Sequence, residues 1–449
     1  MQKVKLDLAK AGGKIKYMNA VNNGPTAPNV RGTSTNFDLY KEAEFSFARL
    51  HDSAFFTGYG GEFSVDVHRI FRNFDADVND PASYIFEPTD KYLKNIIDAG
   101  TQVFYRLGAG IEHGYKFGTL PPKDFKKWAE ICEHIIMHYN EGWADGFHYG
   151  IEYWEIWNEP DTGYKQGNSP TWGGTMDQFF EFFEIALYYL KGKFPNLKFG
   201  GPSLCSVTDS LDIFEDMFTY LTRDGRHAPL DFFSWHMYGE DVNEFPRKIK
   251  LVDKVLTKYG YSDLETILNE WNYVYGWKGD EYIYSLKQQK ALKGSSFVAG
   301  AMCVGQAEKL DTLMYYDARP CGFNGIFEQG TYRPFKTYYV YLMFRDLLHL
   351  GTHVPTEYAN GNVYNVAATD KDGNYGMMVT YFNADDNAEN ERVCIEVENS
   401  EGVYEVECYA LDENHDRELV RAENFTAKNY KIYLNMPVHS TYYVSIKKI

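Results

Sequence analysis

The sequence predicts an α/β fold: a (β/α)8 TIM barrel followed by an antiparallel β-sandwich domain. Between residues 14 and 348, short apolar runs typical of buried strands alternate with longer helical stretches, and eight such units follow one another. Beyond about Gly351 the helical period disappears, and short alternating runs are separated by turn residues such as Asp372-Gly373-Asn374. With 449 residues, the chain is long enough for both domains.

We therefore predict a barrel over residues 14–348 and a β-sandwich over residues 349–449. Residues 1–13 contain an alternating run that we expect to join the sandwich as a strand, because seven runs leave one sheet edge to be covered. An open doubly wound sheet is the alternative to the barrel. It would need a glycine-rich turn after its first strand, and Val21-Asn22-Asn23-Gly24-Pro25 does not fit that pattern.

The elements are placed by apolar periodicity and by the residues that end each run. We expect the barrel strands at residues 15–19, 45–49, 101–107, 151–157, 197–201, 230–235, 266–270 and 312–316. We expect helices at residues 89–98, 122–139, 176–194, 211–223, 244–259, 286–306 and 334–348, the last with Pro334 in its first turn. The sandwich runs lie at residues 363–368, 376–382, 393–397, 403–410, 418–421, 430–434 and 441–446.

The most informative stretch is residues 151–161, IEYWEIWNEPD. An aromatic, strand-forming run leads directly to Glu159, and Pro160 ends the run because its ring removes the next backbone donor. An aromatic wall around a carboxyl group excludes water and raises its pKa, which suits a general acid. Taken alone, the same glutamate could instead cap a helix or pair with a surface arginine.

A second strand-end carboxylate favours the chemical interpretation. Residues 266–272, TILNEWN, form a short apolar run that ends in Asn269 and Glu270. Active sites of (β/α)8 barrels lie where the strands end, and paired carboxylates flanked by aromatic rings and amides suit the cleavage of glycosidic bonds. We expect Glu159 to act as acid/base and Glu270 as nucleophile. The sequence leaves the separation of the two carboxyl groups open, and with it retention or inversion.

Other strand ends supply candidate partners. Arg49 could lower the pKa of Glu270, or it could close the barrel through a buried ion pair. The Tyr238 hydroxyl, two residues after His236, could donate to Glu270, and Asn158 could bind a sugar 2-hydroxyl. The candidates for substrate binding are Asn158, Arg49, His236 and Tyr238, with His51, Asp52, Trp271, Tyr315 and Asp317 as weaker ones.

Composition excludes several classes of partner. The net charge of −18 disfavours a nucleic-acid surface, and no apolar stretch of about 20 residues predicts a membrane span. The first residues lack the apolar core of a signal peptide, and six scattered cysteines fit a reducing compartment, so we expect a cytoplasmic protein. Aromatic residues make up 17% of the chain, which suits carbohydrate or apolar ligands as well as a tyrosine-rich core.

No cofactor and no metal site are expected. His134 and His138 have the helical spacing of two zinc ligands, but no third ligand lies nearby, and a solvated helix face is the simpler explanation. No nucleotide-binding loop, serine elbow or CxxC pair occurs. The expected partner is an oligosaccharide or glycoside substrate, and homo-oligomer formation is left open.

Taken together, the strand-end motifs resemble those of the clan A retaining glycosidases, and most closely glycoside hydrolase family 39, which contains β-xylosidases and α-L-iduronidases. The segments that carry the resemblance are Arg49-Leu50-His51-Asp52, Trp157-Asn158-Glu159-Pro160-Asp161, His236-Met237-Tyr238, Asn269-Glu270-Trp271-Asn272, and the barrel's end at 324–327 and 333–339. The resemblance implies a barrel with a trailing β-sandwich, and it assigns the acid/base to Glu159, the nucleophile to Glu270 and a sugar-binding amide to Asn158. Tyr315-Tyr316 stands where the family pattern has tryptophan, and the loop at residues 108–113 also departs from it.

These observations predict a retaining exo-glycosidase that removes terminal β-xylosyl or related pentosyl units by double displacement through a covalent glycosyl-enzyme. Two alternatives remain. The chain could be an endo-acting glycanase of the same clan, or a catalytically inactive carbohydrate-binding protein on a barrel scaffold.

Overall fold

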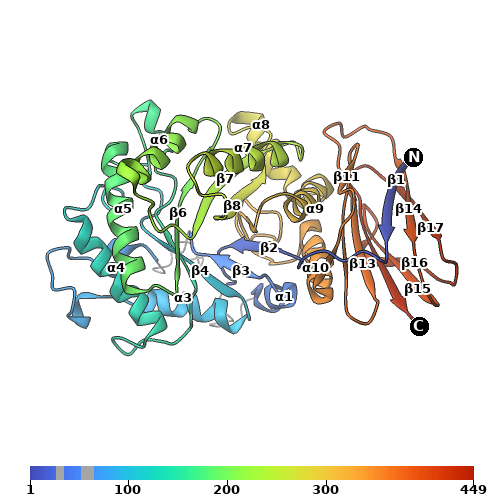
Figure 1. Cartoon of the computed structure of the whole chain (residues 1–449), viewed down its shortest axis with the longest axis horizontal. Coiled ribbons are helices and arrows are strands. Elements are labelled where there is room, and N and C mark those ends of the chain that lie inside the picture. Colours follow the sequence, from blue (N-terminus) through green and yellow to red (C-terminus); the bar gives the residue numbers. More distant parts are fainter. Residues whose placement is uncertain (27–34, 52–64) are drawn as a thin grey trace.

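The structure is a computed structural model that describes residues 1–26, 35–51 and 65–449. Eight parallel strands close into a barrel in the order β2-β3-β4-β5-β6-β7-β8-β9, and two β-sheets lie beside it (Figure 1). The predicted fold class is therefore confirmed. Among the described residues, no helix combines the length and the apolar character needed to cross a bilayer.

The barrel strands lie within a few residues of their predicted positions. They are β2 (Tyr17–Asn22), β3 (Phe47–Arg49), β4 (Gln102–Leu107), β5 (Tyr153–Ile156), β6 (Lys198–Leu204), β7 (Phe232–Gly239), β8 (Glu265–Tyr273) and β9 (Thr312–Tyr315). Strand β7 continues past its predicted end at residue 235, because residues His236 to Gly239 pair with Glu270 to Tyr273 of β8.

The helices are α1 (Phe37–Ala43), α2 (Val67–Ile70), α3 (Glu87–Asp98), α4 (Phe125–Asn140), α5 (Met176–Lys193), α6 (Leu211–Leu221), α7 (Glu244–Lys258), α8 (Gly279–Gln288), α9 (Leu292–Ala307) and α10 (Lys336–Leu350). The single helix predicted at residues 286–306 is wrong, because the extended backbone of Ala291 separates α8 from α9. Pro334 does not lie in the first turn of the last helix. It forms a β-bridge with Phe327 ahead of α10.

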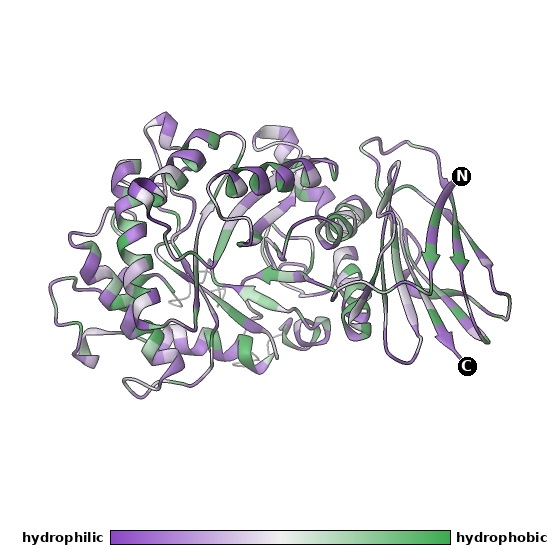
Figure 2. Ribbon diagram, in the orientation of Figure 1, coloured by the Kyte–Doolittle hydropathy of each residue, from purple (hydrophilic) through white to green (hydrophobic). Residues whose placement is uncertain are grey.

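Side chains inside the barrel form an apolar layer below and a polar layer above. The apolar layer comprises Ala20, Phe47, Phe104, Tyr153, Phe232, Ile267 and Met314, each from a different strand. The helices turn their apolar faces toward the outside of the barrel. In α7, for example, Phe245, Ile249 and Val252 are buried, and Figure 2 shows hydrophobic and hydrophilic residues on the same helices.

The second domain contains two sheets. A three-stranded sheet has the order β1-β14-β17, and a larger sheet has the order β10-β12-β13-β18-β15-β16, with β11 beside β12. The strands are β1 (Gln2–Asp7), β10 (Thr352–Val354), β11 (Ala359–Asn360), β12 (Val363–Thr369), β13 (Tyr375–Tyr381), β14 (Glu391–Glu398), β15 (Tyr404–Leu411), β16 (Asp416–Phe425), β17 (Tyr430–Met436) and β18 (Thr441–Lys448). The N-terminal strand β1 pairs with β14, and this pair is parallel within an otherwise antiparallel domain. The boundaries at residues 13 and 348 stay a prediction.

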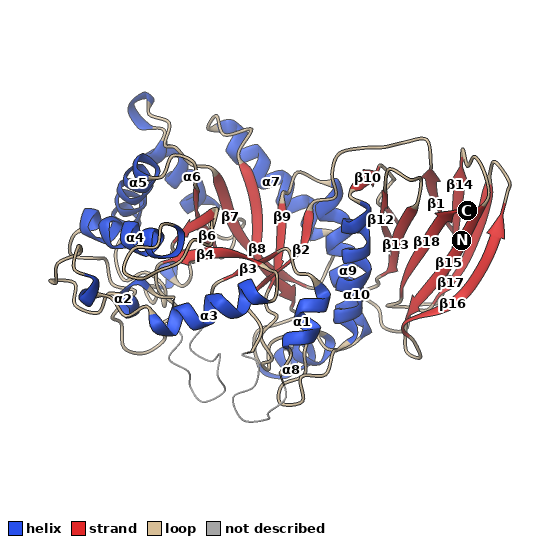
Figure 3. Cartoon of the chain, turned by 90° about the horizontal axis from the view of Figure 1, so that it is seen from below, coloured by secondary structure: helices blue, strands red, loops and turns tan. Residues whose placement is uncertain are grey.

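Helices α9 and α10 stand between the barrel and the larger sheet (Figure 3). Every residue of α9 from Lys293 to Gln306 is buried, so this helix has no solvated face. Tyr364, Met378 and other residues of the larger sheet belong to the same apolar core as the barrel. The barrel and the sheet therefore share one continuous core through these helices.

A glycine in β6 is predicted to be essential for barrel packing. A methyl group on Gly200 would lie 2.1 Å from the backbone oxygen of Phe232, so Gly200→Ala should lower the free energy of unfolding by about 1–3 kcal/mol. Gly192→Ala is the matched control, because open space surrounds this exposed position in α5 and alanine should stabilise the helix by about 0.5–1 kcal/mol. Thermal unfolding of both variants checks the prediction, which fails if they shift in the same direction.

Candidate active site

Arg49, at the end of β3, is the centre of the polar layer inside the barrel. Its side chain is completely buried. It donates hydrogen bonds to Glu155 (Nε, 2.7 Å), Asn158 (Nη2, 2.6 Å), Ser203 (Nη2, 3.1 Å), Asn22 (Nη1, 3.1 Å) and Glu270 (Nη1, 3.3 Å). The two roles that the sequence left open for Arg49, an ion pair that closes the barrel and a contact with Glu270, therefore occur together.

Glu155 of β5 also belongs to the polar layer inside the barrel, and the sequence analysis did not single it out. Its carboxylate accepts hydrogen bonds from the hydroxyls of Ser203 (2.5 Å) and Ser234 (2.6 Å) and from the Asn269 amide, besides the Arg49 ion pair. Burial alone would raise the pKa of Glu155, but the Arg49 charge and the hydroxyl donors outweigh it and hold the pKa below its ordinary value. A charged residue inside an otherwise apolar strand run was the available signal.

Glu270 is directed into the barrel by an irregularity in strand pairing. Leu268 lies opposite Trp235 and Glu270 lies opposite His236, so Asn269 is an extra residue on β8. Such a bulge breaks the simple alternation of a strand. Both Asn269 and Glu270 consequently face the interior, where Asn269 reaches Glu155 and Glu270 reaches Arg49.

The Glu270 carboxylate has polar partners on both oxygens. Oε1 accepts a hydrogen bond of 2.6 Å from the Tyr238 hydroxyl, as the sequence predicted. Oε2 lies 3.3 Å from Nη1 of Arg49, 3.5 Å from Nε2 of His51 and 3.8 Å from Nδ1 of His236. The carboxylate is thus held between a hydroxyl donor and a fixed cation.

Glu159 lies in the loop after β5, with its backbone in the left-handed region (φ 49°). Its amide donates to the carbonyls of Pro202 and Ser203, and its Oε2 accepts a hydrogen bond of 3.1 Å from Thr162. Glu159 and Glu270 are each only 6% exposed. Burial raises the pKa of Glu159. The predicted direction of this pKa shift therefore agrees with the structure.

The predicted cause of that shift needs a correction. The ring of Trp154 stacks on Tyr105 at 4.7 Å, and the ring of Trp157 contacts Trp128 of α4 and Phe182 of α5. Both indoles therefore pack between strands and helices and do not wall the Glu159 carboxyl group. Enclosure by the barrel mouth as a whole removes water from this carboxyl group.

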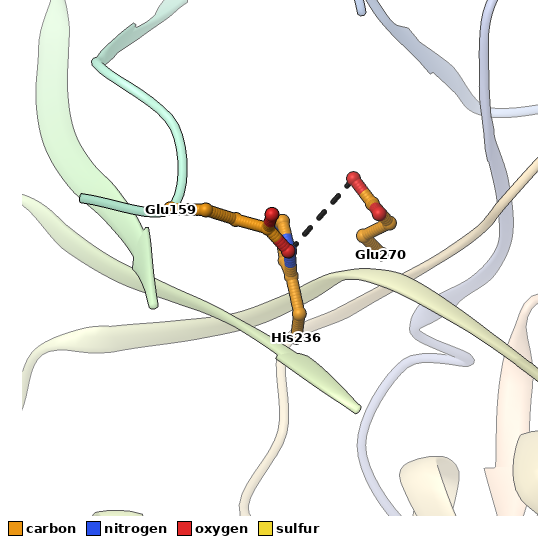
Figure 4. A group of neighbouring side chains, drawn as sticks. All are labelled: Glu159, His236 and Glu270. Carbon is orange, nitrogen blue, oxygen red and sulfur yellow. Dashed lines mark hydrogen bonds and ion pairs between the residues drawn. The ribbon is translucent and has the colours of Figure 1, made fainter. Parts of the chain in front are cut away.

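The two carboxylates meet across the barrel mouth, together with His236 of β7 (Figure 4). One oxygen of each glutamate and Nδ1 or Nε2 of the histidine all lie within 4.8 Å of one another. Nδ1 of His236 is 2.7 Å from Oε1 of Glu159. Burial lowers the pKa of His236 to about 3, so the ring is neutral near pH 7 and holds Glu159 by a hydrogen bond without adding a positive charge.

Two carboxylates and an imidazole are also donors that a divalent metal accepts. Glu159, His236 and Glu270 are the side chains that could hold one. The guanidinium of Arg49, 3.3 Å from Glu270, would repel such a cation at close range and already balances the carboxylate charge. The charge around these three side chains therefore disfavours a bound divalent cation.

Asn158 and His51 lie beside the carboxylates. The Oδ1 atom of Asn158 accepts a hydrogen bond from Arg49, which turns the amide nitrogen away, and this buried Nδ2 has no protein acceptor in the described part of the chain. The ring of His51 contacts Glu270 and packs edge-on against Tyr316 at 5.3 Å. Asp52, also a candidate, lies outside the described residues.

Two weaker candidates, Trp271 and Tyr315, pack away from this site. The ring of Trp271 packs against Phe245 of α7 and Tyr315, and the ring of Tyr315 also contacts Tyr341 of α10. These two aromatic side chains face the helices because they alternate with inward-facing neighbours, so their assignment to sugar binding is wrong. Asp317 is completely buried and accepts a hydrogen bond from the backbone N–H of Arg319, which fits a role in shaping the loop after β9.

The sequence suggested that His134 and His138 lie on a solvated face of their helix. In the structure they do not. Both are buried. Nδ1 of His134 lies 2.8 Å from the Glu130 carbonyl, and the ring of His138 stacks on Phe86 at 3.6 Å and contacts Asp90. These contacts give the two histidines structural roles.

Comparison with known proteins identifies the family. A family model described as "Glycosyl hydrolases family 39" matches residues 2–270. The chain belongs to glycosyl hydrolase family 39. Curated relatives include two proteins named "Beta-xylosidase", from Caldicellulosiruptor saccharolyticus (25% identical over 215 residues) and Geobacillus stearothermophilus (26% over 221 residues). The aligned regions cover 45% and 46% of this chain but only 38% of each relative.

Solved structures share the fold of this family 39 protein over its whole length. A glucosidase from Croceicoccus marinus has a TM-score of 0.80 at 20% identity, covering 100% of this chain and 99% of that chain. A monomeric β-xylosidase from Caulobacter crescentus CB15 has a TM-score of 0.73 at 14% identity, with 100% of both chains covered. At these identities the similarity shows the fold and does not specify the substrate.

The buried Arg49 ion pair predicts a large loss of stability when the cation is removed. Arg49→Met leaves the charge of Glu155 buried without a counterion, which should cost about 3–5 kcal/mol of unfolding free energy at pH 7. This deficit should begin to shrink above the ordinary carboxyl range as the pH falls, because without Arg49 burial raises the pKa of Glu155 and its protonation removes the unpaired charge. Lys94→Met is the control. It breaks an exposed pair with Asp98 and should change little. Urea unfolding at several pH values measures both variants, and equal losses would contradict the prediction.

Proposed function

We propose that this family 39 protein is a retaining exo-glycosidase that removes terminal β-xylosyl or related pentosyl units from oligosaccharides. The observation that carries the proposal is the approach of Glu159 and Glu270 to within 4.8 Å at the carboxyl ends of two barrel strands. Retaining enzymes hold their carboxyl groups about 5–5.5 Å apart, whereas inverting enzymes leave a gap of roughly 6.5–9.5 Å for a water molecule. The short approach favours direct attack by a carboxylate.

In the first step, Glu159 gives its proton to the glycosidic oxygen while the Glu270 carboxylate attacks the anomeric carbon. The bond to the leaving group breaks, and an ester joins the sugar to Glu270. In the second step, Glu159 is a carboxylate and takes a proton from water. The water oxygen attacks the anomeric carbon, releasing the sugar and restoring the Glu270 carboxylate.

The environments of the two glutamates support these different roles. Burial raises the pKa of Glu159, which favours the protonated form that an acid needs. Glu270 lies against the Arg49 guanidinium and accepts a hydrogen bond from the Tyr238 hydroxyl, contacts that hold its carboxylate in position as a nucleophile. Arg49 holds the Oδ1 atom of Asn158. The Nδ2 atom, which has no acceptor among the described residues, is therefore available to donate a hydrogen bond to a sugar hydroxyl.

The curated relatives named β-xylosidase support a xylosyl substrate, although one structural neighbour is described as a glucosidase. An endo-acting glycanase is the alternative, since a family 30 endoxylanase shares the fold with a TM-score of 0.62. A catalytically inactive sugar-binding protein is disfavoured by the intact pair of glutamates with distinct environments. A panel of aryl α- and β-glycosides, together with product analysis on long xylan, separates these functions.

Replacement of the nucleophile should abolish turnover. Glu270→Gln should reduce the hydrolysis of an aryl β-xyloside by several orders of magnitude, because the substitution removes the carboxylate that attacks the anomeric carbon. NMR of the wild-type reaction should show the β-anomer of xylose first, before mutarotation. First appearance of the α-anomer would establish inversion and reject Glu270 as nucleophile. Glu152→Gln is the control that should retain activity, because Glu152 is exposed and lies directly before the first residue of β5.

Replacement of the acid should depend on the leaving group. Glu159→Ala should slow substrates with poor leaving groups by about 10²–10⁴-fold and affect activated aryl glycosides much less in the glycosylation step. Activity of the wild type should fall as the pH rises through the raised pKa of Glu159, because the acid then loses its proton. This alkaline limb in the pH profile of kcat/KM should disappear in Glu159→Ala. Equal losses on all leaving groups would speak against the acid role.

A further inference from the structure

We infer that the aromatic side chains of Trp277, Tyr282 and Phe323 form a stacking platform for the sugar unit on the leaving-group side of the cleaved bond. This inference rests on the proposed exo-glycosidase function and specifies its substrate as an oligosaccharide rather than any xyloside. All three residues lie beyond residue 270, where the match to the family model ends.

The three rings of the platform are nearly parallel. Trp277 and Phe323 have ring centroids 5.9 Å apart at an interplanar angle of 12°, and Tyr282 lies 6.2 Å from Trp277 at 23° and 6.3 Å from Phe323 at 18°. They come from separate segments: Trp277 precedes α8, Tyr282 lies within it, and Phe323 is in the loop after β9. The start of α8 and the loop after β9, which are remote in sequence, thus bring rings of similar orientation together.

The platform is continuous with the catalytic carboxylates. The ring of Tyr238 packs edge-on against Trp277 at 5.0 Å and against Phe323 at 5.9 Å, while its hydroxyl donates to Glu270 at 2.6 Å. Phe323 also lies 6.0 Å from the ring of Tyr316, which contacts His51. A substrate bound at Glu270 therefore has the platform as its neighbour.

Exposure indicates that the platform meets a ligand. Trp277 is 57% exposed, although it is the largest apolar side chain of the group, whereas Glu270 is 6% exposed. An exposed aromatic cluster beside a polar site is typical of a ligand-binding surface, and aromatic faces pack against the C–H faces of sugar rings. In an exo-acting enzyme the terminal sugar occupies the buried end, so the rest of the chain extends toward solvent. The platform, made of the exposed Trp277 ring and the partly buried rings of Tyr282 and Phe323, then holds the leaving-group sugar.

The experiment compares xylobiose with methyl β-D-xyloside, two substrates with poor leaving groups that differ by one sugar ring. Trp277→Ala should lower kcat/KM for xylobiose about tenfold relative to that for methyl β-D-xyloside. Trp277→Phe should restore most of the ratio, because a ring remains for stacking. Phe323→Ala should shift the ratio in the same direction. Tyr275→Ala is the matched control: this residue is 50% exposed and near Trp277 in sequence, but its ring contacts Tyr284, so the ratio should stay unchanged.

The outcomes separate the platform from the proposed function. If the wild type hydrolyses neither substrate nor an aryl β-xyloside, the xylosidase proposal fails and the platform as a leaving-group subsite fails with it. If the wild type hydrolyses both but Trp277→Ala changes them equally, the function stands and the platform is rejected. A second comparison uses an aryl β-xyloside and an aryl β-xylobioside, which carries one more xylosyl unit at the non-reducing end. If Trp277→Ala lowers kcat/KM only for the xylobioside, the assignment of the platform to the leaving-group side is overturned.

Discussion

The structure depends on one buried positive charge inside the barrel. Arg49 is completely enclosed and is balanced by Glu155 at 2.7 Å and Glu270 at 3.3 Å. A buried charge is costly unless its donors are paired, and the hydrogen bonds of Arg49 reach several strands and the loop after β5. The hydrogen-bonded ion pairs of Arg49 compensate the cost of burying charge in the barrel. They also fix Glu270, and a hydrogen bond from Arg49 orients the amide of Asn158.

The two proposed catalytic glutamates differ because the barrel gives them different surroundings. Glu270 shares its oxygens with a cation and a tyrosine hydroxyl, whereas Glu159 lies against a neutral imidazole and a threonine hydroxyl. Burial outweighs the other influences on Glu159, and its pKa rises. Identical side chains therefore have different partners a few ångströms apart.

The barrel mouth also separates functions by depth. Polar groups that contact the carboxylates lie in the interior, and the rings of Trp277 and Phe323 extend from Tyr238 toward solvent. On the outside of the barrel, helix α9, which is buried from Lys293 to Gln306, joins the barrel core to the larger sheet. The second domain thus covers apolar surface of the barrel and leaves the strand ends to the loops.

The sequence by itself determined the order of the barrel strands, the two-part architecture and the candidate pair Glu159 and Glu270, because apolar periodicity and strand-end motifs are local signals. Only the tertiary structure decided which neighbouring side chains face inward. The extra residue Asn269 places both itself and Glu270 inside the barrel and turns Trp271 toward the helices. Such directions depend on strand register, and register is fixed by pairing between segments that are distant in the chain.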